Sequence, residues 1–284
     1  MSFIKALAAI VLLTCCLSLH AQEEEALVDE EELAEEMAPD GEASAAELAK
    51  AAQNPIASLI SVPIQVNMDP NWGPLEKTNT VTNIQPVLPF SLNDDWNLVT
   101  RTILPVVSQP GLAPGMERKN GISDMLFTAF FVPNKASKVT WGIGPAINIP
   151  TASNSRLGFD EWGTGVSFVA LTMPGRWVIG GLISNVWSVG ADEESEFSLF
   201  TLQPFINYNL PKGWYLTFSP VITANWDVES DQRWTVPIGG GIGRVFRIGS
   251  QAMNAQAQYY HHAKSPDITG DWSIRLQLQF MFPR

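Results

Sequence analysis

The chain has 284 residues, of which 45% are apolar and 16% charged, and its formal net charge is −12. Most of that charge is local, because residues 22–50 hold 12 acidic side chains and one lysine, whereas residues 51–284 hold 17 acidic against 15 basic side chains. The main body is therefore nearly neutral and offers no basic patch for nucleic acid or anionic lipid. Both cysteines, Cys15 and Cys16, lie near the N-terminus, which excludes disulfides, a cysteine zinc site and a cysteine nucleophile from the rest of the chain.

Residues 1–21 have the features of a cleaved secretory signal. Lys5 precedes an apolar run over residues 6–16, and the small residue Ala21 ends the segment. The run is too short to cross a bilayer as a helix, which takes about 20 residues. A lipoprotein signal is the less favoured alternative, because Cys15 precedes the cysteine that would carry the lipid, Cys16. We therefore expect export and cleavage after Ala21.

Residues 22–54 form an acidic arm, which we expect to be periplasmic. Its N-terminal part is predicted to be disordered, because a segment so rich in acids cannot bury enough apolar area to fold. Residues 44–53 (SAAELAKAAQ) favour a short helix that ends at Asn54-Pro55. The arm could plug a lumen or bind a partner, but a solvated leader is the simpler interpretation and the one the sequence favours.

From residue 55 to 284 the dominant pattern has a period of two. Near the C-terminus, apolar side chains such as Trp272 and Leu276 alternate with Ser273, Arg275 and Gln277. Such alternation predicts β-strands, and most of the runs are long enough for a tilted membrane-spanning strand of about 9–11 residues. The predicted strands number twelve: 58–68, 78–90, 95–107, 121–133, 138–149, 163–173, 176–188, 196–208, 213–226, 234–246, 252–263 and 271–282.

The connections between these strands alternate in length. The short ones are 91–94, 134–137, 174–175, 209–212 and 247–251. The longer ones are 69–77, 108–120, 150–162, 189–195, 227–233 and 264–270. Short turns on one side and long loops on the other are typical of outer-membrane barrels with an even number of strands.

A soluble β-sandwich would also show alternation, but its polar face would carry many Lys, Glu and Asp. Here the polar face is rich in Ser, Thr, Asn, Gln and Gly, as in a barrel lumen. Aromatic residues cluster at the strand ends, where membrane-interface girdles occur: Trp96, Trp177, Trp187, Trp214, Trp226, Trp234, Tyr259 and Trp272. We predict an all-β fold, a transmembrane antiparallel up-and-down β-barrel of about 12 strands over residues 55–284, in the outer membrane of a Gram-negative bacterium. Its surroundings would be the lipid bilayer and lipopolysaccharide.

The last strand closes on an aromatic residue, Phe282, two positions before the end of the chain. A C-terminal strand of alternating apolar residues that ends in an aromatic resembles the signal read by the barrel-assembly machinery. In most such proteins the aromatic is the final residue, whereas here Pro283-Arg284 follows. Because the strand keeps the alternation and ends in Phe282, we expect the assembly machinery to be a partner of this chain.

Four segments resemble a known family: 54–61 (NPIASLIS), 83–90 (NIQPVLPF), 98–106 (LVTRTILPV) and 203–210 (QPFINYNL). The chain is similar to bacterial outer-membrane transporters often mislabelled "neuromedin U", which are related to channels named for the meta-pathway of phenol degradation. The resemblance covers most of residues 50–284. It implies a barrel with a transport role, and it brings no motif with a defined chemical task, so no site residue is carried over.

The sequence offers little for catalysis. His261 and His262 are adjacent and so face opposite sides of a strand, and no His-x-Ser pair shares a face, since Ser265 lies beyond the strand end. Acids at 192–194, 227, 231 and 267 could meet His262 at a rim, but loop acids are usually solvated. The run Gly239–Gly243 continues into a strand rather than a helix, so we interpret it as sheet curvature and not as a phosphate site. No ligand pattern for a metal is present in the loop acids, and no cofactor is expected.

Polar residues on the inward face are the candidate site. The residues that we expect to line a lumen are Arg101, Gln203, Asn207, Asn225, Gln256, Gln258, Arg275, Gln277 and Gln279, together with Gln65, Asn83, Gln85 and Asn254. A wet lumen of amides with two arginines would pass small polar or weakly anionic solutes, and inward Val99, Ile103, Val178 and Leu182 would equally suit an aromatic or aliphatic solute. Twelve strands lie between a filled and an open interior, so the lumen is either open or plugged.

The function that we predict is a passive channel or transporter for small solutes. A non-conducting structural or adhesion barrel is the alternative, and an outer-membrane barrel hydrolase comes third.

Overall fold

The computed structural model describes residues 45–284 except 136, 191, 193–194 and 283–284; the signal segment, the arm up to residue 44 and the final Pro-Arg lie outside the described residues. The described part contains the α-helix α2 (Ala45–Gln53), the 3-10 helix η1 (Pro211–Gly213) and fifteen strands. The strands are β1 (Ile60–Trp72), β2 (Lys77–Ile84), β3 (Val87–Ser91), β4 (Trp96–Gln109), β5 (Lys119–Ile122), β6 (Met125–Pro133), β7 (Thr140–Ile149), β8 (Gly163–Thr172), β9 (Trp177–Ser188), β10 (Ser198–Asn209), β11 (Trp214–Phe218), β12 (Ile222–Asn225), β13 (Trp234–Ile248), β14 (Gln251–Lys264) and β15 (Trp272–Phe282).

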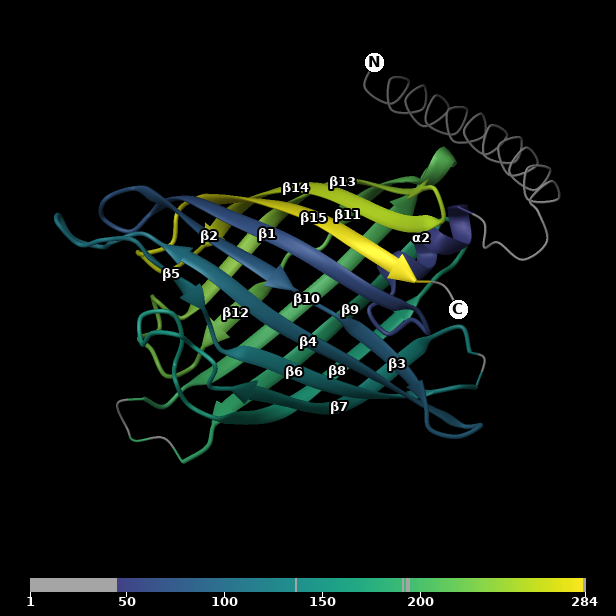
Figure 1. Cartoon of the computed structure of the whole chain (residues 1–284), viewed down its shortest axis with the longest axis horizontal. Helices are drawn as coiled ribbons and strands as arrows, with labels where there is room; N and C mark the ends of the chain where they lie inside the picture. The colour runs from purple at the N-terminus through teal and green to yellow at the C-terminus, as the bar shows by residue number, and fades with distance from the viewer. Residues whose placement is uncertain (1–44, 136, 191, 193–194, 283–284) are drawn as a thin grey trace, which may run out of the picture. The chain divides into compact units, whose positions relative to one another are not determined.

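The sheet closes on itself as an antiparallel barrel (Figure 1). β1 pairs with β2 on one side and with β15 on the other, in a register that runs from Ile60 opposite Phe282 to Met68 opposite Ile274. Three predicted strands are each split in two (β2/β3, β5/β6 and β11/β12), so the barrel has the predicted 12 strands. Pro86 and Pro220 lie at two of these breaks, where a residue without an N–H cannot continue the ladder.

The connection between β1 and β2 differs from the predicted loop 69–77. β1 continues to Trp72, and only residues 73–76 connect it to β2. The register shifts between Asp69 and Trp72, so a β-bulge absorbs Pro70 and the left-handed Asn71 (φ 62°) inside the strand. The sequence Asp-Pro-Asn at residues 69–71 favours a turn, but a bulge at the rim of the barrel accommodates the same residues.

The two faces of the barrel wall differ as the alternation predicts. On β11, Trp214 and Leu216 point outward and are 39% and 51% exposed, whereas Tyr215 and Thr217 point inward and are 0% and 6% exposed. Register carries this pattern to the neighbouring strand, where Arg244 pairs with Trp214 and stacks over its ring outside the barrel. The outer surface is therefore mostly apolar. No helix in the described part of the chain is long and apolar enough to cross a membrane.

The two ends of the barrel differ in their connections. At one end, which we call the turn end, lie the short connections 92–95, 134–139, 173–176, 210–213 and 249–250, the start of β1 and the end of β15. At the other, the loop end, lie 110–118, 150–162, 189–197, 226–233 and 265–271 beside the tight hairpin 73–76. Aromatic rings contact one another near both ends: Trp177 with Tyr208 and Trp96 with Trp141 at the turn end, and Trp226 with Trp234 at the loop end.

Two local features hold the wall and one loop in shape. The glycine run lies within β13, as predicted; a Cβ on Gly243 would lie 2.2 Å from Cζ of Tyr215, so the inward tyrosine ring requires the glycine.

At the loop end, the buried carboxylate of Asp124 accepts hydrogen bonds from the backbone N–H groups of Ala152 (3.1 Å), Phe159 (2.6 Å) and Asp160 (3.2 Å). That carboxylate therefore fixes the loop 150–162.

Candidate functional site

The interior of the barrel has a polar side built by β1, β11, β14 and β15. Its side chains bond to one another: the Tyr215 hydroxyl donates to Asn254 Oδ1 (2.6 Å), and Asn254 Nδ2 donates to Gln279 Oε1 (3.1 Å). Nearer the loop end, the Tyr260 hydroxyl donates to Gln258 Oε1 (2.7 Å), and Gln258 Nε2 donates to the Oε1 of Gln256 (2.7 Å). These contacts orient the amides that remain turned to the interior.

Arg275 on β15 is held within this polar side. Its Nε donates to Asn67 Oδ1 (3.0 Å), and its Nη1 donates to the Ser219 carbonyl (2.9 Å) and to Gln258 Oε1 (3.3 Å). The guanidinium carbon lies 5.0 Å from the ring centre of Tyr260. All three acceptors are neutral oxygens, and the acidic side chain that acts electrostatically on Arg275 is Asp69 of β1.

Arg101 on β4 lies where the polar side meets an apolar one. Its Nη2 donates to Gln85 Oε1 (2.5 Å), which is the one hydrogen bond that its guanidinium makes within the described chain. In the sheet register Arg101 stands opposite Val87 on one side and Thr128 on the other, and all three are inward-facing. The cation therefore borders directly on apolar residues.

The apolar side is a continuous cluster across β3, β4, β6, β8, β9 and β10. It consists of Val87, Val99, Phe130, Val132, Val169, Leu171, Val178, Leu182 and Phe205, all buried, with Ile56 packed among them. Among the apolar residues predicted to face inward, Val99, Val178 and Leu182 belong to this cluster, and Ile103 shares their side of β4. The interior is thus amphipathic, with amides and arginines facing aliphatic and aromatic side chains.

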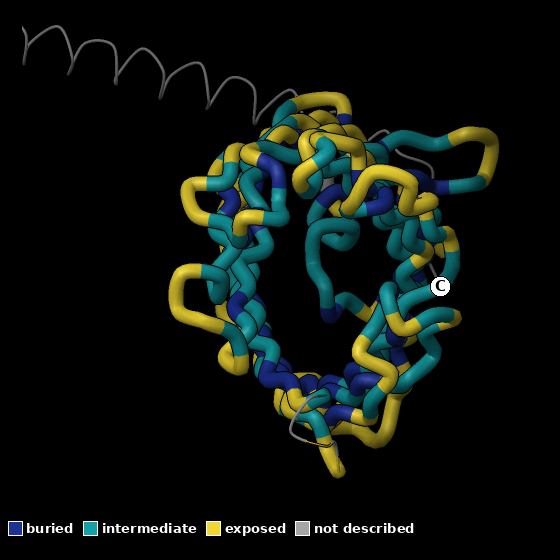
Figure 2. Tube along the Cα trace, turned by 90° about the vertical axis from the view of Figure 1, so that its left-hand side faces the viewer, coloured by how far each residue is buried: buried dark blue, intermediate teal, exposed yellow. Residues whose placement is uncertain are grey.

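The segment 45–59 lies inside the barrel at the turn end, as the chain within the ring of strands in Figure 2 illustrates. Leu48 and Ala49 of α2 are 3% and 1% exposed and pack on the inward residues of β11, β13, β14 and β15: Tyr215, Val245, Ala252 and Met281. Ile56 packs on the opposite, apolar side. The solvated leader favoured by the sequence is therefore wrong for residues 45–54, and the plug alternative describes them.

Polar contacts fix the same segment. Gln53 Nε2 donates to Asn209 Oδ1 on β10 (2.8 Å). Asn54 Oδ1 accepts the N–H of Ile56 (3.0 Å), and the Asn54 carbonyl accepts that of Ala57 (3.3 Å), which closes a turn after the helix. The sequence signal for this placement is faint: a narrow, alanine-rich helix with one large apolar residue, Leu48, suits a confined lumen.

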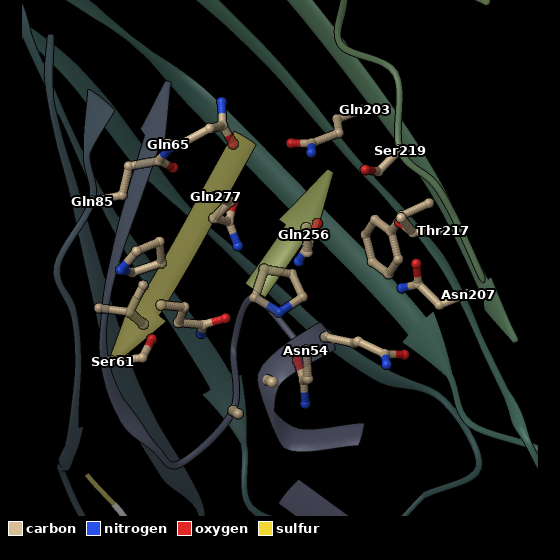
Figure 3. Close-up of a pocket in the computed structure, with 18 of the residues that line it drawn as sticks. Asn54, Ser61, Gln65, Gln85, Gln203, Asn207, Thr217, Ser219, Gln256 and Gln277 are labelled. Carbon is tan, nitrogen blue, oxygen red and sulfur yellow. The ribbon is translucent and has the colours of Figure 1, made fainter. Parts of the chain in front are cut away.

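A cavity that is partly open to solvent lies between these walls and the segment 45–59. Figure 3 shows Gln65, Gln203, Gln256 and Gln277 turned toward one space, with Asn54 at its edge beside α2. Most of the predicted lumen residues line it: Arg101, Gln203, Asn207, Gln256, Gln258, Arg275, Gln277 and Gln279, with Gln65 and Gln85. The list of lumen residues predicted from the sequence lacks Ser61, Pro63, Val87, Phe205, Thr217, Ser219 and the residues of the 45–59 segment, which complete the lining together with Leu182.

Three predicted lumen residues lie elsewhere. Asn225 lies at the end of β12, opposite Leu199, where its Oδ1 accepts the N–H of Asp227 (3.1 Å). Asn83 lines a second hollow nearer the loop end, together with Arg156 of the loop 150–162. Asn254 is completely buried behind the cavity lining, between Tyr215 and Gln279.

One His–Ser contact escaped the sequence analysis. His262 Nε2 lies 3.2 Å from Ser273 Oγ, and its Nδ1 lies 2.6 Å from the Gly270 carbonyl oxygen. The pair forms across β14 and β15, whose register places Tyr260 opposite Ser273, so a search for His-x-Ser within one strand cannot find it. With Nδ1–H donated to the carbonyl, Nε2 can accept the serine proton, as a general base would.

The other groups considered from the sequence are His261 and the loop acids. His261 lies opposite Trp272 on the outer face and is exposed. Among the residues that the structure describes, no group of three or more His, Cys, Asp or Glu could hold a metal ion. Glu193 and Glu194, which belonged to the predicted rim cluster, lie outside the described residues.

Comparisons with known proteins bear on the fold. No family model matches the sequence, and no curated protein is similar to it. Among solved structures, an outer membrane channel from Pseudomonas putida F1 is similar with a TM-score of 0.61 and 16% identity, over 79% of this chain and 96% of that one. Outer membrane phospholipase A from Escherichia coli aligns over 79% of this chain and 96% of its own at 12% identity, with a TM-score of only 0.40. The first likeness shows the fold of an outer-membrane barrel, and the second is too low to bear on activity.

Proposed function

We propose that the protein is a passive channel for small polar, weakly anionic or aromatic solutes in the outer membrane of a Gram-negative bacterium. The observation that carries the proposal is the central cavity, which is lined by amides and two arginines and by no acidic side chain. Its position inside a barrel with an apolar outer surface favours passage along the barrel axis. The likeness to the Pseudomonas putida channel supports the same function.

The family resemblance supports the location of the path. The four segments that resemble the outer-membrane transporters all contribute to this cavity, through residues such as Asn54, Gln85, Arg101 and Gln203. They lie far apart in the sequence, so the fold brings the resembling residues to one place. We infer that this shared place is the transport path.

We propose that the loop end faces the cell exterior, beside lipopolysaccharide, and that the turn end faces the periplasm with the acidic arm. Short turns are periplasmic in barrels of this kind. Phe282 ends β15 at the turn end, where it is exposed and pairs with Ile60, and we propose it as the contact for the barrel-assembly machinery. Protease added to intact cells should cut the long loops and spare the turns.

Single-channel recording of the refolded chain in a planar bilayer tests the channel. We expect an ion current with anion preference, and replacing Arg101 and Arg275 with Gln should shift the reversal potential in a KCl gradient toward cation preference. Arg244→Gln, on the outer surface, is the matched control and should leave the reversal potential unchanged. Absence of current at every voltage would overturn the proposal.

A non-conducting structural or adhesion barrel is the second candidate. The segment 45–59 favours it, because a helix and a turn occupy the lumen at the turn end. The same recordings separate the two functions, since a non-conducting barrel carries no ion current in the bilayer.

A further inference from the structure

The cavity has an apolar side and a polar, cationic side, a combination that a simple polar pore does not require. Leu182 and Phe205 line it on one side, and Gln256, Gln277 and Arg275 line it on the other. Arg101 stands at the boundary, opposite Val87 of the apolar cluster in the sheet register and two residues from Val99 on its own strand. A solute in this cavity therefore meets a cation and an apolar surface at the same time.

The guanidinium of Arg101 has N–H groups that make no hydrogen bond within the described chain. Its Nη2 bonds to Gln85, and within the described chain no other hydrogen bond uses its remaining N–H groups. The side chain nevertheless lines the cavity, where no acidic residue is among the lining. A planar guanidinium with free parallel donors matches the two oxygens of a carboxylate.

We propose that the solute carried by this channel is a small organic carboxylate with an apolar body, such as an aromatic or branched aliphatic acid. The carboxylate would bind Arg101, and the body would lie on Leu182 and Phe205. The inference rests on the proposed channel function and adds the substrate class. A neutral aromatic would leave the arginine with Gln85 as its hydrogen-bond partner and no anion, and an inorganic anion would leave the apolar side without contact.

The test is current block in a planar bilayer with the full refolded chain in KCl. Benzoate, acetate and benzyl alcohol are added in turn, which offers both groups, the carboxylate alone and the ring alone. We expect benzoate to reach half-block at a concentration about tenfold below that of either partial analogue, because one charge-assisted hydrogen-bonded contact or one buried ring is worth at least that factor.

Variants assign the two halves of the contact. Arg101→Gln should raise the half-blocking concentration of benzoate about tenfold, to the level of benzyl alcohol, and Arg101→Lys should restore part of the block. Leu182→Asn should weaken block by benzoate and leave block by acetate unchanged. Arg244→Gln, outside the barrel, should change neither.

The outcomes separate this inference from the channel itself. A KCl current that benzoate and acetate block equally in the unaltered protein would overturn the substrate class and leave the channel standing. Equal benzoate block in the unaltered protein, Arg101→Gln and Leu182→Asn would do the same. Absence of any KCl current in the unaltered protein would overturn both.

Discussion

Releasing the segment 45–59 from the lumen should increase conductance. The segment is anchored at two points that touch different walls: Leu48 on the residues of β11 and β13–β15, and Ile56 on the apolar cluster. Truncating a buried Leu or Ile to Ala costs about 2–5 kcal/mol. Because the two sites share no contacts, the costs should add to at least about 4 kcal/mol.

That cost is large relative to a single hydrogen bond of the segment, although the buried contact of Leu59 remains in the variant. A helix of nine residues has little stability of its own in water, and the hydrogen bond from Gln53 to Asn209 contributes about 1 kcal/mol. At about 1.4 kcal/mol per factor of ten, the double variant Leu48→Ala/Ile56→Ala should shift the docked-to-free ratio by nearly a thousandfold. The segment would then be outside the lumen for a larger share of the time than in the unaltered protein.

Two measurements report the release. Single-channel conductance should rise in the double variant, and trypsin should cut after Lys50, which is the only Lys or Arg between residues 22 and 76. The control Leu92→Ala/Ile248→Ala removes the same side-chain types at the same end, from positions 49% and 64% exposed, and should behave like the unaltered protein. If conductance and cleavage rate stay the same in Leu48→Ala/Ile56→Ala, the two anchors do not hold the segment and the reasoning is refuted.

Three further predictions concern the wall, a loop and catalysis. Gly243→Ala should destabilise the folded barrel by about 1–3 kcal/mol, because the new Cβ would overlap the Tyr215 ring; Gly181→Ala, whose Cβ would have 3.7 Å of clearance, is the control, and heat-dependent mobility on SDS gels measures both. Asp124→Asn should speed trypsin cleavage at Arg156, because an amide has one oxygen for the three N–H donors; the exposed Asp231→Asn should not, and an equal rate in both variants would contradict the role of the carboxylate. Ser273→Ala should leave hydrolysis of p-nitrophenyl butyrate at the background of the unaltered protein, whereas a lost turnover would identify Ser273 and His262 as an esterase pair.

The fold is largely predictable because each wall residue faces one of two unlike surroundings. Trp214 and Tyr215 are adjacent in sequence, yet one is exposed outside and the other completely buried inside. That contrast repeats along the strands, and it produces the alternation of apolar and polar residues in the sequence. The bulge at Asp69–Trp72 escapes such reasoning, because Pro and Asn indicate a turn wherever they stand.

The site is predictable only in part, because its remaining contacts depend on register and on packing between distant segments. Arg101 and Gln203 are recognisable as inward from alternation alone. The contact of His262 with Ser273 requires the pairing of β14 with β15, and the position of Ile56 requires a cavity that no single strand defines. The local sequence predicts whether a side chain faces inward or outward, but it does not predict which residue of another strand the side chain contacts.

The two arginines are the strongest physical argument for an anionic solute. A cation removed from water costs free energy unless charge or hydrogen bonds compensate it. Arg275 donates to neutral oxygens and is attracted by the carboxylate of Asp69, whereas Arg101 donates one hydrogen bond, to a single amide, so the fold supplies partial compensation, and less of it for Arg101. A barrel that needed only to fill its interior would do so at lower cost with more glutamines. Both guanidinium groups instead line the cavity, which is the arrangement expected when the solute itself brings the negative charge.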